Sequence, residues 1–189
     1  EGTDVKIFVS TRIDLDAKQI ENPLLIPVRC GAVFDERTNV KSLGDNTGDN
    51  ISAKRMSFNE LTVQYWAWKN IDADYYGFCH YRRYFDFSDT PHQQNSYGEI
   101  MDAAITPEAI AEYGIDDDSI AKAVEGWDVI TTPMNNVREF DGFVSLKDHW
   151  NADPHLQLKD LRHMYDVLCA MHPEYQVDAD AVLNGTRAA

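Results

Sequence analysis

ADYYGFC, residues 73–79, is a short apolar run that leads directly into HYRRY, residues 80–84. Its length and aromatic content predict a buried β-strand. The run VKIFVS at residues 5–10 predicts a first strand, and residues 25–33 predict a further extended segment. Because helices are predicted between these strands, the order of elements indicates an α/β domain with a mostly parallel, layered sheet and flanking helices.

The first predicted helix begins at a polar tetrapeptide. Ser57-Phe58-Asn59-Glu60 matches a capping box, in which the Ser and Glu side chains bind each other's backbone N–H groups. We therefore expect a helix from Ser57 to about Asn70. Apolar residues recur at intervals of three and four and predict its buried face: Phe58, Leu61, Tyr65 and Trp68.

The second half of the chain carries further helix and strand signals. Residues 120–125 predict a helix, preceded by acidic residues that suit a helix N-terminus, and residues 127–133 predict another strand. Asp153 and Pro154 resemble an N-cap and a first-turn proline. The helix they open carries four apolar residues on one face: Leu161, Met164, Tyr165 and Leu168. A last short helix is predicted for residues 173–183.

Length and composition favour one globular domain over residues 1–189. The sequence has 43% hydrophobic residues, no apolar run long enough to span a membrane, and no secretory signal. Its three cysteines are widely spaced and form no CxxC pair, which favours reduced thiols in the cytoplasm over a zinc or redox motif. The net charge of −15 disfavours binding to nucleic acid, because phosphate backbones are held by excess Lys and Arg.

The basic cluster His80, Arg82 and Arg83 is conspicuous in so acidic a chain. In parallel sheets, ligands bind beyond the carboxyl ends of the strands, which places the residues after Val9 and Cys79 at the predicted site. Guanidinium groups bind diphosphate or carboxylate oxygens in a bidentate manner. On an extended backbone, His80 and Arg82 are expected on one side and Arg83 on the other. The alternative is that these arginines pair with structural carboxylates.

The polar loop at residues 45–50 (DNTGDN) permits two interpretations. Its oxygens suit a ribose, a sugar hydroxyl or a metal ion, although the spacing does not match a calcium loop. A turn stabilised by Asx hydrogen bonds is the simpler alternative on composition. Among the aromatic residues, Tyr84 is the better candidate for a ligand contact because it follows the basic cluster, whereas Tyr65 and Trp68 are expected in the core. GxGxxG, Walker, HExxH and GxSxG motifs are absent from the sequence.

Five sequence words occur in one order: residues 6–11 (KIFVST), 45–52 (DNTGDNIS), 59–62 (NELT), 65–70 (YWAWKN) and 76–85 (YGFCHYRRYF). Together they resemble the bacterial family catalogued as domain of unknown function 4422. The family is described as glycosyltransferases of capsular or exopolysaccharide assembly with a glycosyltransferase A-like (Rossmann-like) fold. The resemblance implies a nucleotide-sugar donor and a polysaccharide or lipid-linked acceptor. The family pattern also continues past residue 189, so we expect the chain to be truncated at its C-terminus.

In the fold that the resemblance implies, the first strand and the following loop hold the nucleotide. The residues expected to bind the nucleotide sugar are Ser10, Thr11, Arg12, Asn50, Lys54, His80, Arg82, Arg83 and Tyr84. A later strand of that fold normally ends in an Asp-x-Asp motif that binds Mn²⁺ or Mg²⁺, whereas the strand at residues 75–79 leads into His-Tyr-Arg-Arg. We therefore expect Arg82 and Arg83 to hold the diphosphate in place of a metal. A dependence on Mn²⁺ or Mg²⁺ stays an open alternative.

The leading hypothesis is a cytoplasmic transferase of the hexosyltransferase type. An inverting mechanism requires a carboxylate base, for which Asp45, Asp49 and Asp141 are the candidates. Two alternatives stay open: a noncatalytic nucleotide-sugar-binding module, and an interaction module of a polysaccharide assembly complex. Peripheral association with the inner face of the cell membrane is also left open.

Overall fold

The computed structural model describes residues 2–133, 139 and 143–183. The chain forms two compact units. The first comprises Glu1–Gln93 with Ile100–Ile130, and the second comprises Gln94–Glu99 with Thr131–Ala189. The candidate site lies entirely within the first unit.

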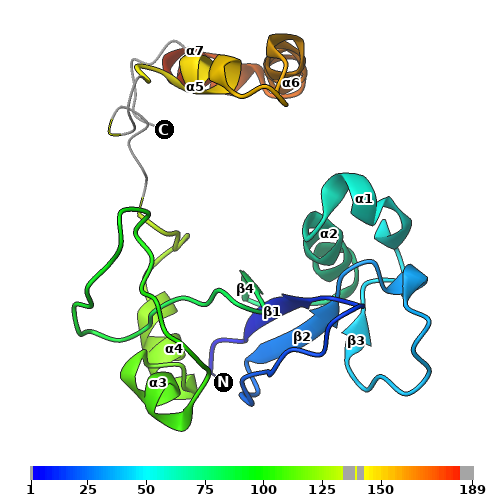
Figure 1. Ribbon diagram of the computed structural model, residues 1–189, viewed down its shortest axis with the longest axis vertical. Helices are drawn as coiled ribbons and strands as arrows, with labels where there is room; N and C mark the ends of the chain where they lie inside the picture. Colours follow the sequence, from blue (N-terminus) through cyan, green and yellow to red (C-terminus); the bar gives the residue numbers. More distant parts are fainter. Residues whose placement is uncertain (1, 134–138, 140–142, 184–189) are drawn as a thin grey trace. The chain divides into compact units, whose positions relative to one another are not determined.

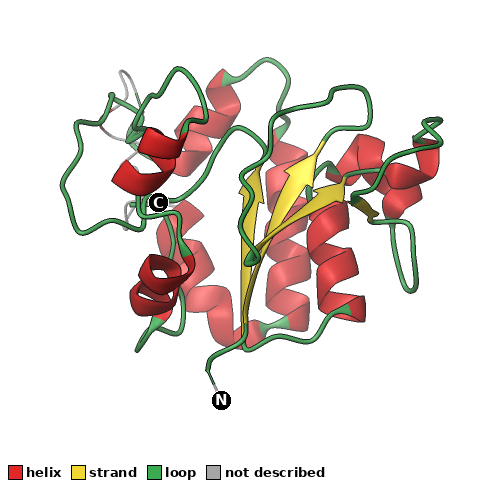
Figure 2. Cartoon of the chain, turned by 90° about the horizontal axis from the view of Figure 1, so that it is seen from below, coloured by secondary structure: helices red, strands yellow, loops and turns green. Residues whose placement is uncertain are grey.

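The first unit contains a four-stranded parallel sheet in the order β3-β2-β1-β4. Its strands are β1 (Val5–Thr11), β2 (Leu25–Arg29), β3 (Leu43–Gly44) and β4 (Tyr75–His80). The strands run side by side in one direction (Figure 2). This arrangement confirms the α/β class and the parallel sheet, as well as the strands expected near residues 5–10 and 73–79. The predicted burial of the second strand is wrong, because β4 lies at the edge of the sheet and none of its residues is fully buried.

The register of the sheet brings polar residues together at one edge. Ser10 of β1 lies beside His80 of β4, and Thr11 lies beside Arg29 of β2. Because parallel strands share their direction, these residues all lie at the carboxyl ends of their strands. This edge is therefore the place at which the topology predicts a ligand site.

Hydrophobic clusters cover both faces of the sheet. Helix α2 (Leu61–Asn70) packs on one face, where Val63 and Trp66 contact Phe8 and Val28. Helix α4 (Asp117–Val124) contributes Ile120 to the cluster on the other face. Figure 1 shows α1 and α2 on one side of the strands and α3 and α4 on the other. Buried on both faces, β1 has the continuous apolar sequence expected of a central parallel strand.

The helical segment after the polar loop differs from its prediction at two points. It is divided into α1 (Arg55–Phe58) and α2, because Asn59 has a φ of 46° and ends the first helix. The capping box at Ser57 is therefore wrong, since Ser57 lies inside α1. Its Glu60 instead occupies the N-cap position of α2.

The predicted buried face of this helix is also wrong. The side of α2 that faces the sheet carries Thr62, Val63, Trp66 and Ala67. Leu61 is 51% exposed and Trp68 is 66% exposed. Lys69 covers the ring of Trp68, with its Nζ 3.6 Å from the ring centroid. The periodicity of the aromatic residues therefore follows the outer surface of the helix.

The remainder of the first unit contains α3 (Pro107–Glu112) and α4. The side chain of Asp116 caps α4 by accepting a hydrogen bond from the N–H of Ser119 at 2.9 Å, which confirms this helix. The predicted strand at residues 127–133 is wrong, since none of these residues forms a ladder. Val129 is 72% exposed. Its β propensity does not suffice without a paired neighbour.

The described part of the second unit contains three α-helices: α5 (Leu146–Ala152), α6 (Leu158–Met171) and α7 (Gln176–Leu183). The helix predicted for residues 173–183 is confirmed as a 3₁₀ turn followed by α7. Asp153 and Pro154 do not open a helix: they lie in the turn between α5 and α6, and Gln157 occupies the N-cap position of α6. No helix in the described residues is long and apolar enough to cross a membrane.

Candidate functional site

Two adjoining cavities lie at the carboxyl ends of β1 and β4. The larger has a volume of about 360 Å³ and is lined by Phe8, Ser10, Glu60, Val63, Gln64, Phe78, Cys79, His80, Arg82 and Arg83. The smaller has about 190 Å³ and is lined by Ser10, Thr11, Arg12, Cys30, Arg55, Asn59, Glu60, His80, Tyr81 and Arg82. Four residues line both, so the cavities form one continuous recess of a size that suits a small ligand.

A tight turn at the end of β4 positions the basic cluster. The backbone N–H of Arg83 donates to the carbonyl of His80 at 2.9 Å, and the N–H of His80 donates back to Arg83 at 3.2 Å. Tyr81 anchors the turn: its ring is buried in the core, and its N–H donates to Ser10 at 3.0 Å. Because the backbone turns here, the expected alternation of sides is wrong, and Arg82 and Arg83 line the same cavity.

The arginines of the recess differ in their pairing. Arg12 forms a two-pronged contact with Asp14, which raises the pKa of Arg12 and lowers that of Asp14 to about 2. Within the described residues, neither Arg82 nor Arg83 forms an ion pair with a carboxylate, and the same holds for Arg55. The guanidinium of Arg82 instead lies over the ring of Tyr81, with its Cζ 5.2 Å from the ring centroid. In a chain of net charge −15, three guanidinium groups without a carboxylate partner indicate an anion site.

His80 lies between these cations and Glu60. Burial lowers the pKa of His80, Glu60 opposes that shift, and Arg82 and Arg83 reinforce it. The Nε2 of His80 is 3.7 Å from the carboxylate of Glu60. With its pKa below the usual value, the imidazole is neutral at pH 7. The charge of the recess is therefore set by the arginines and by Glu60.

The structure brings six of the nine predicted nucleotide-sugar residues to the recess: Ser10, Thr11, Arg12, His80, Arg82 and Arg83. Asn50, Lys54 and Tyr84 do not line it. The side chain of Asn50 closes its own loop, accepting from Ser52 and donating to Gly48. Tyr84 packs against the core, where burial raises its pKa to about 12.

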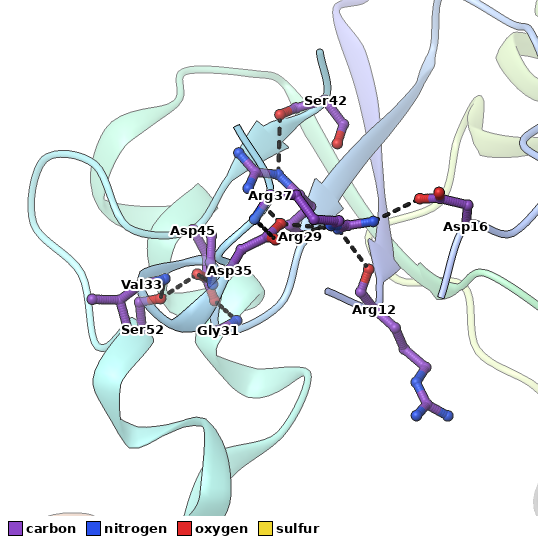
Figure 3. Close-up of polar contacts among 11 residues, drawn as sticks. Arg12, Asp16, Arg29, Gly31, Val33, Asp35, Arg37, Ser42, Asp45 and Ser52 are labelled. Atoms are coloured by element: carbon purple, nitrogen blue, oxygen red, sulfur yellow. Dashed lines mark hydrogen bonds and ion pairs between the residues drawn. The ribbon is translucent and has the colours of Figure 1, made fainter. Parts of the chain in front are cut away.

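Asp45 is fully buried and accepts four hydrogen bonds. The backbone N–H groups of Gly31 and Ala32 donate to it at 2.8 and 2.9 Å, and the hydroxyls of Ser52 and Thr62 complete the set. Figure 3 shows the carboxylate directed at Gly31 and Ser52. This network joins the end of β2 to α2. A carboxylate enclosed in this way cannot reach the hydroxyl of a bound ligand unless some of these hydrogen bonds break. The geometry therefore favours a structural role for Asp45.

A second network lies beside it and supports the strand ends. Asp35 accepts from Arg29 at 2.7 Å and from Arg37 at 2.9 Å, and these contacts hold its pKa well below the usual range. Arg37 also donates to the backbone carbonyl of Arg12 at 3.4 Å and pairs with Asp16. The guanidinium of Arg12 points away from this network (Figure 3). The pairing of arginines with structural carboxylates therefore applies to Arg29 and Arg37.

The other two predicted bases do not lie in the recess. The carboxylate of Asp49 accepts from the hydroxyl of Tyr65 at 3.1 Å, and its backbone N–H donates to Asn70. Gly48, with a φ of 57°, allows this close approach, because Asn70 occupies the space a Cβ would need. Asp141 lies outside the described residues.

The residues of the recess that escaped prediction include Arg55, Asn59 and Glu60. In the sequence, Asn59 and Glu60 belong to the predicted capping box and to the sequence word at residues 59–62, and neither predicts a role in the site. The signal that could have separated them is Asn59 itself, since asparagine tolerates the positive φ that ends α1. Arg55 is adjacent to the predicted Lys54, and the 3₁₀ turn η2 (Ser52–Lys54) decides which of the two faces the recess.

The residues at the end of β4 do not fit a divalent metal ion. Mn²⁺ and Mg²⁺ require oxygen ligands, whereas His80, Arg82 and Arg83 supply one imidazole and two cations. Among the residues that the structure describes, no three His, Cys, Asp or Glu side chains are arranged to hold a metal. Guanidinium groups are the charges available here for an anionic ligand.

Comparison with known proteins gives two matches. The model of a family described as Domain of unknown function (DUF4422) matches residues 6–189. A solved structure described as the apo structure of the WbbM bifunctional glycosyltransferase is similar, with a TM-score of 0.85 and 30% sequence identity. The similar region covers 92% of this chain and 30% of that one, so this chain spans less than a third of that protein. No curated protein gives a significant match.

Proposed function

The chain belongs to the family described as Domain of unknown function (DUF4422), and on this basis we propose that it transfers a sugar from a nucleotide-sugar donor. The membership confirms the resemblance first drawn from the sequence words at residues 6–85. The fold is shared with a bifunctional glycosyltransferase, which supports a glycosyltransferase-like function. In our proposal the acceptor is a growing polysaccharide or a lipid-linked glycan, and the enzyme works in the cytoplasm, at the inner face of the cell membrane.

The main support for this proposal is the set of arginines in the recess that have no carboxylate partner among the described residues. A nucleotide sugar holds its charge in a diphosphate, which becomes more negative when the bond to the sugar breaks. Arg55, Arg82 and Arg83 face the recess from two sides, α1 and the turn after β4. Each hydrogen bond from a guanidinium to an anionic oxygen contributes about 1.5–3 kcal/mol. These three cations therefore supply the stabilisation of the leaving group that a metal ion supplies elsewhere.

A thermal-shift titration tests donor binding directly. The panel contains UDP-glucose, UDP-galactose, UDP-N-acetylglucosamine, GDP-mannose, UDP and GDP, each with and without Mn²⁺. A ligand at 100 times its Kd stabilises the folded state by about 2.7 kcal/mol, which corresponds to roughly 5–10 °C for a chain of this size. We expect one nucleotide class to give this shift without Mn²⁺.

Arg82→Ala and Arg83→Ala test the assignment of the diphosphate site. Each substitution should weaken binding of the responding nucleotide sugar by about 10- to 100-fold, because it removes one or two charge-assisted hydrogen bonds. Arg162→Ala, an exposed arginine of α6 in the second unit, is the matched control and should leave binding unchanged. Wild-type affinity in both variants of the turn would refute the diphosphate site, and no shift with any donor would refute the proposed function.

A further inference from the structure

Glu60 occupies a singular position in the recess. It lines both cavities, and it is the one carboxylate among the described residues that lines either of them. Its side chain is 51% exposed, and the Oε1 atom lies 3.7 Å from the Nε2 of His80. Glu60 is therefore open to a ligand, in contrast to the enclosed carboxylate of Asp45.

The backbone around Glu60 is built to hold it there. Asn59 is the one residue other than glycine with a positive φ among the described residues, and such strain concentrates at functional sites. The turn at Asn59 ends α1 and starts α2, so that Glu60 falls at the N-cap of α2. Its carbonyl accepts from the N–H of Val63 at 3.1 Å, which fixes the residue at the start of the helix.

The two cavities differ in chemistry on either side of Glu60. The smaller contains Arg12, Arg55 and Arg82 and suits a diphosphate. The larger shares Arg82 with it and adds Arg83. Its floor is apolar and is formed by Phe8, Val63 and Phe78, with the two aromatic rings 5.8 Å apart, and Gln64 is a neutral polar group. The apolar floor suits the face of a sugar ring, whereas the arginines of the two cavities suit the diphosphate.

We propose that Glu60 is the general base that takes the proton from the acceptor hydroxyl. This assignment rests on the proposed function. With the diphosphate on the arginines and the acceptor on the apolar floor, the reacting carbon lies at the boundary where Glu60 stands. The acceptor oxygen forms a bond to the anomeric carbon while the bond from that carbon to the phosphate oxygen breaks. The proton moves to a carboxylate oxygen of Glu60, and the bonding electrons leave with the nucleoside diphosphate.

The other carboxylates considered for this role are engaged elsewhere. Asp45 accepts four hydrogen bonds inside the fold, and Asp49 contacts Tyr65 and Asn70 on α2. His80 borders the same boundary and is neutral, so it can accept a hydrogen bond from a sugar hydroxyl without adding charge. Glu60 is the described residue that combines a carboxylate, exposure to solvent and contact with both cavities.

Glu60→Gln provides the test, because it keeps the shape of the side chain and removes the base. Two quantities are measured with the nucleotide sugar that binds wild type: the Kd, and the rate at which the full chain releases nucleoside diphosphate by transfer to water. We expect the variant to bind within threefold of wild type and to turn over about 10²–10⁴-fold more slowly. Glu125→Gln, an exposed residue at the end of α4, should match wild type in both.

A second variant separates loss of the base from loss of the fold. Glu60→Ala should melt within about 2 °C of wild type, since the replaced side chain is half exposed, and added sodium formate should restore part of its turnover. Parallel loss of binding and turnover in Glu60→Gln would make Glu60 a donor-binding residue and overturn the proposal, as would unchanged turnover. If wild type itself neither binds nor cleaves any nucleotide sugar, the proposed function fails first.

Discussion

Replacing Asp45 by asparagine should destabilise the fold strongly. The carboxylate accepts from two backbone N–H groups and two hydroxyls, all buried. A hydrogen bond to a charged acceptor contributes about 1.5–3 kcal/mol, against about 0.5–1.5 kcal/mol for a neutral pair. Asp45→Asn therefore loses roughly 1 kcal/mol at each of four contacts, and its new NH₂ group faces donors. Because burying a neutral amide is less costly than burying a charge, we expect a net loss of about 3 kcal/mol.

The assay is equilibrium unfolding in urea, followed by circular dichroism. A loss of about 3 kcal/mol is a large share of the stability of an ordinary domain and moves the midpoint by more than 1 M at a typical slope. Asp49→Asn is the matched control, since its carboxylate lies on an exposed loop and should change stability by less than about 1 kcal/mol. A change below 1 kcal/mol in Asp45→Asn, with turnover abolished, would refute the structural role and restore Asp45 as the base.

Three further predictions concern Asn59, His80 and Cys79. Asn59→Gly should raise the free energy of unfolding by about 0.5–1 kcal/mol, because relief of about 1–3 kcal/mol of strain at a positive φ outweighs the cost of about 0.4–1 kcal/mol for the greater freedom of glycine in the unfolded chain; a loss in urea unfolding would contradict this. Burial lowers the pKa of His80 below 6.5, so on acidification the unfolded chain protonates this imidazole before the folded chain does. The free energy of unfolding should therefore be highest above about pH 6.5 and should fall as the pH drops below that value. An NMR titration giving a pKa of 6.5 or more for His80 would count against it. Burial raises the pKa of Cys79 to about 12, so iodoacetamide at pH 8 should alkylate it at least about 100-fold more slowly than free cysteine, as followed by peptide mass spectrometry. Equal rates would show that the thiol is open to solvent.

Local sequence patterns predicted the central part of this fold. The continuous apolar run of β1 is typical of a buried parallel strand, the aromatic run of β4 predicted a strand that lies at the sheet edge, and the acidic residues before α4 mark its start. The polar ends of the strands then located the site, since the rule that ligands bind at the carboxyl ends depends on topology alone. The basic cluster after β4 was recognised for the same reason, and it does line the recess.

The arrangement of α2 was beyond local patterns. Both sides of this helix carry large apolar residues, so periodicity could not decide between the face with Trp68 and the face with Trp66. The choice depends on Asp45, whose buried carboxylate binds Thr62 across 17 positions of sequence. A polar contact of this kind leaves no periodic signal, yet it turns Thr62 and Trp66 toward the sheet.

The sequence by itself determined the class of fold, the positions of its two main strands in the chain and the place of the basic cluster, because these depend on short runs of neighbouring residues. Only the tertiary structure decided which charges are free and which are paired. In the sequence nothing distinguishes Arg29 and Arg37 from Arg82 and Arg83. In the structure Asp35 forms ion pairs with the first two. Pairing depends on distances between segments far apart in the chain, and burial decides its strength. For the same reason, Glu60 became a candidate base only once the turn at Asn59 had placed it between the two cavities.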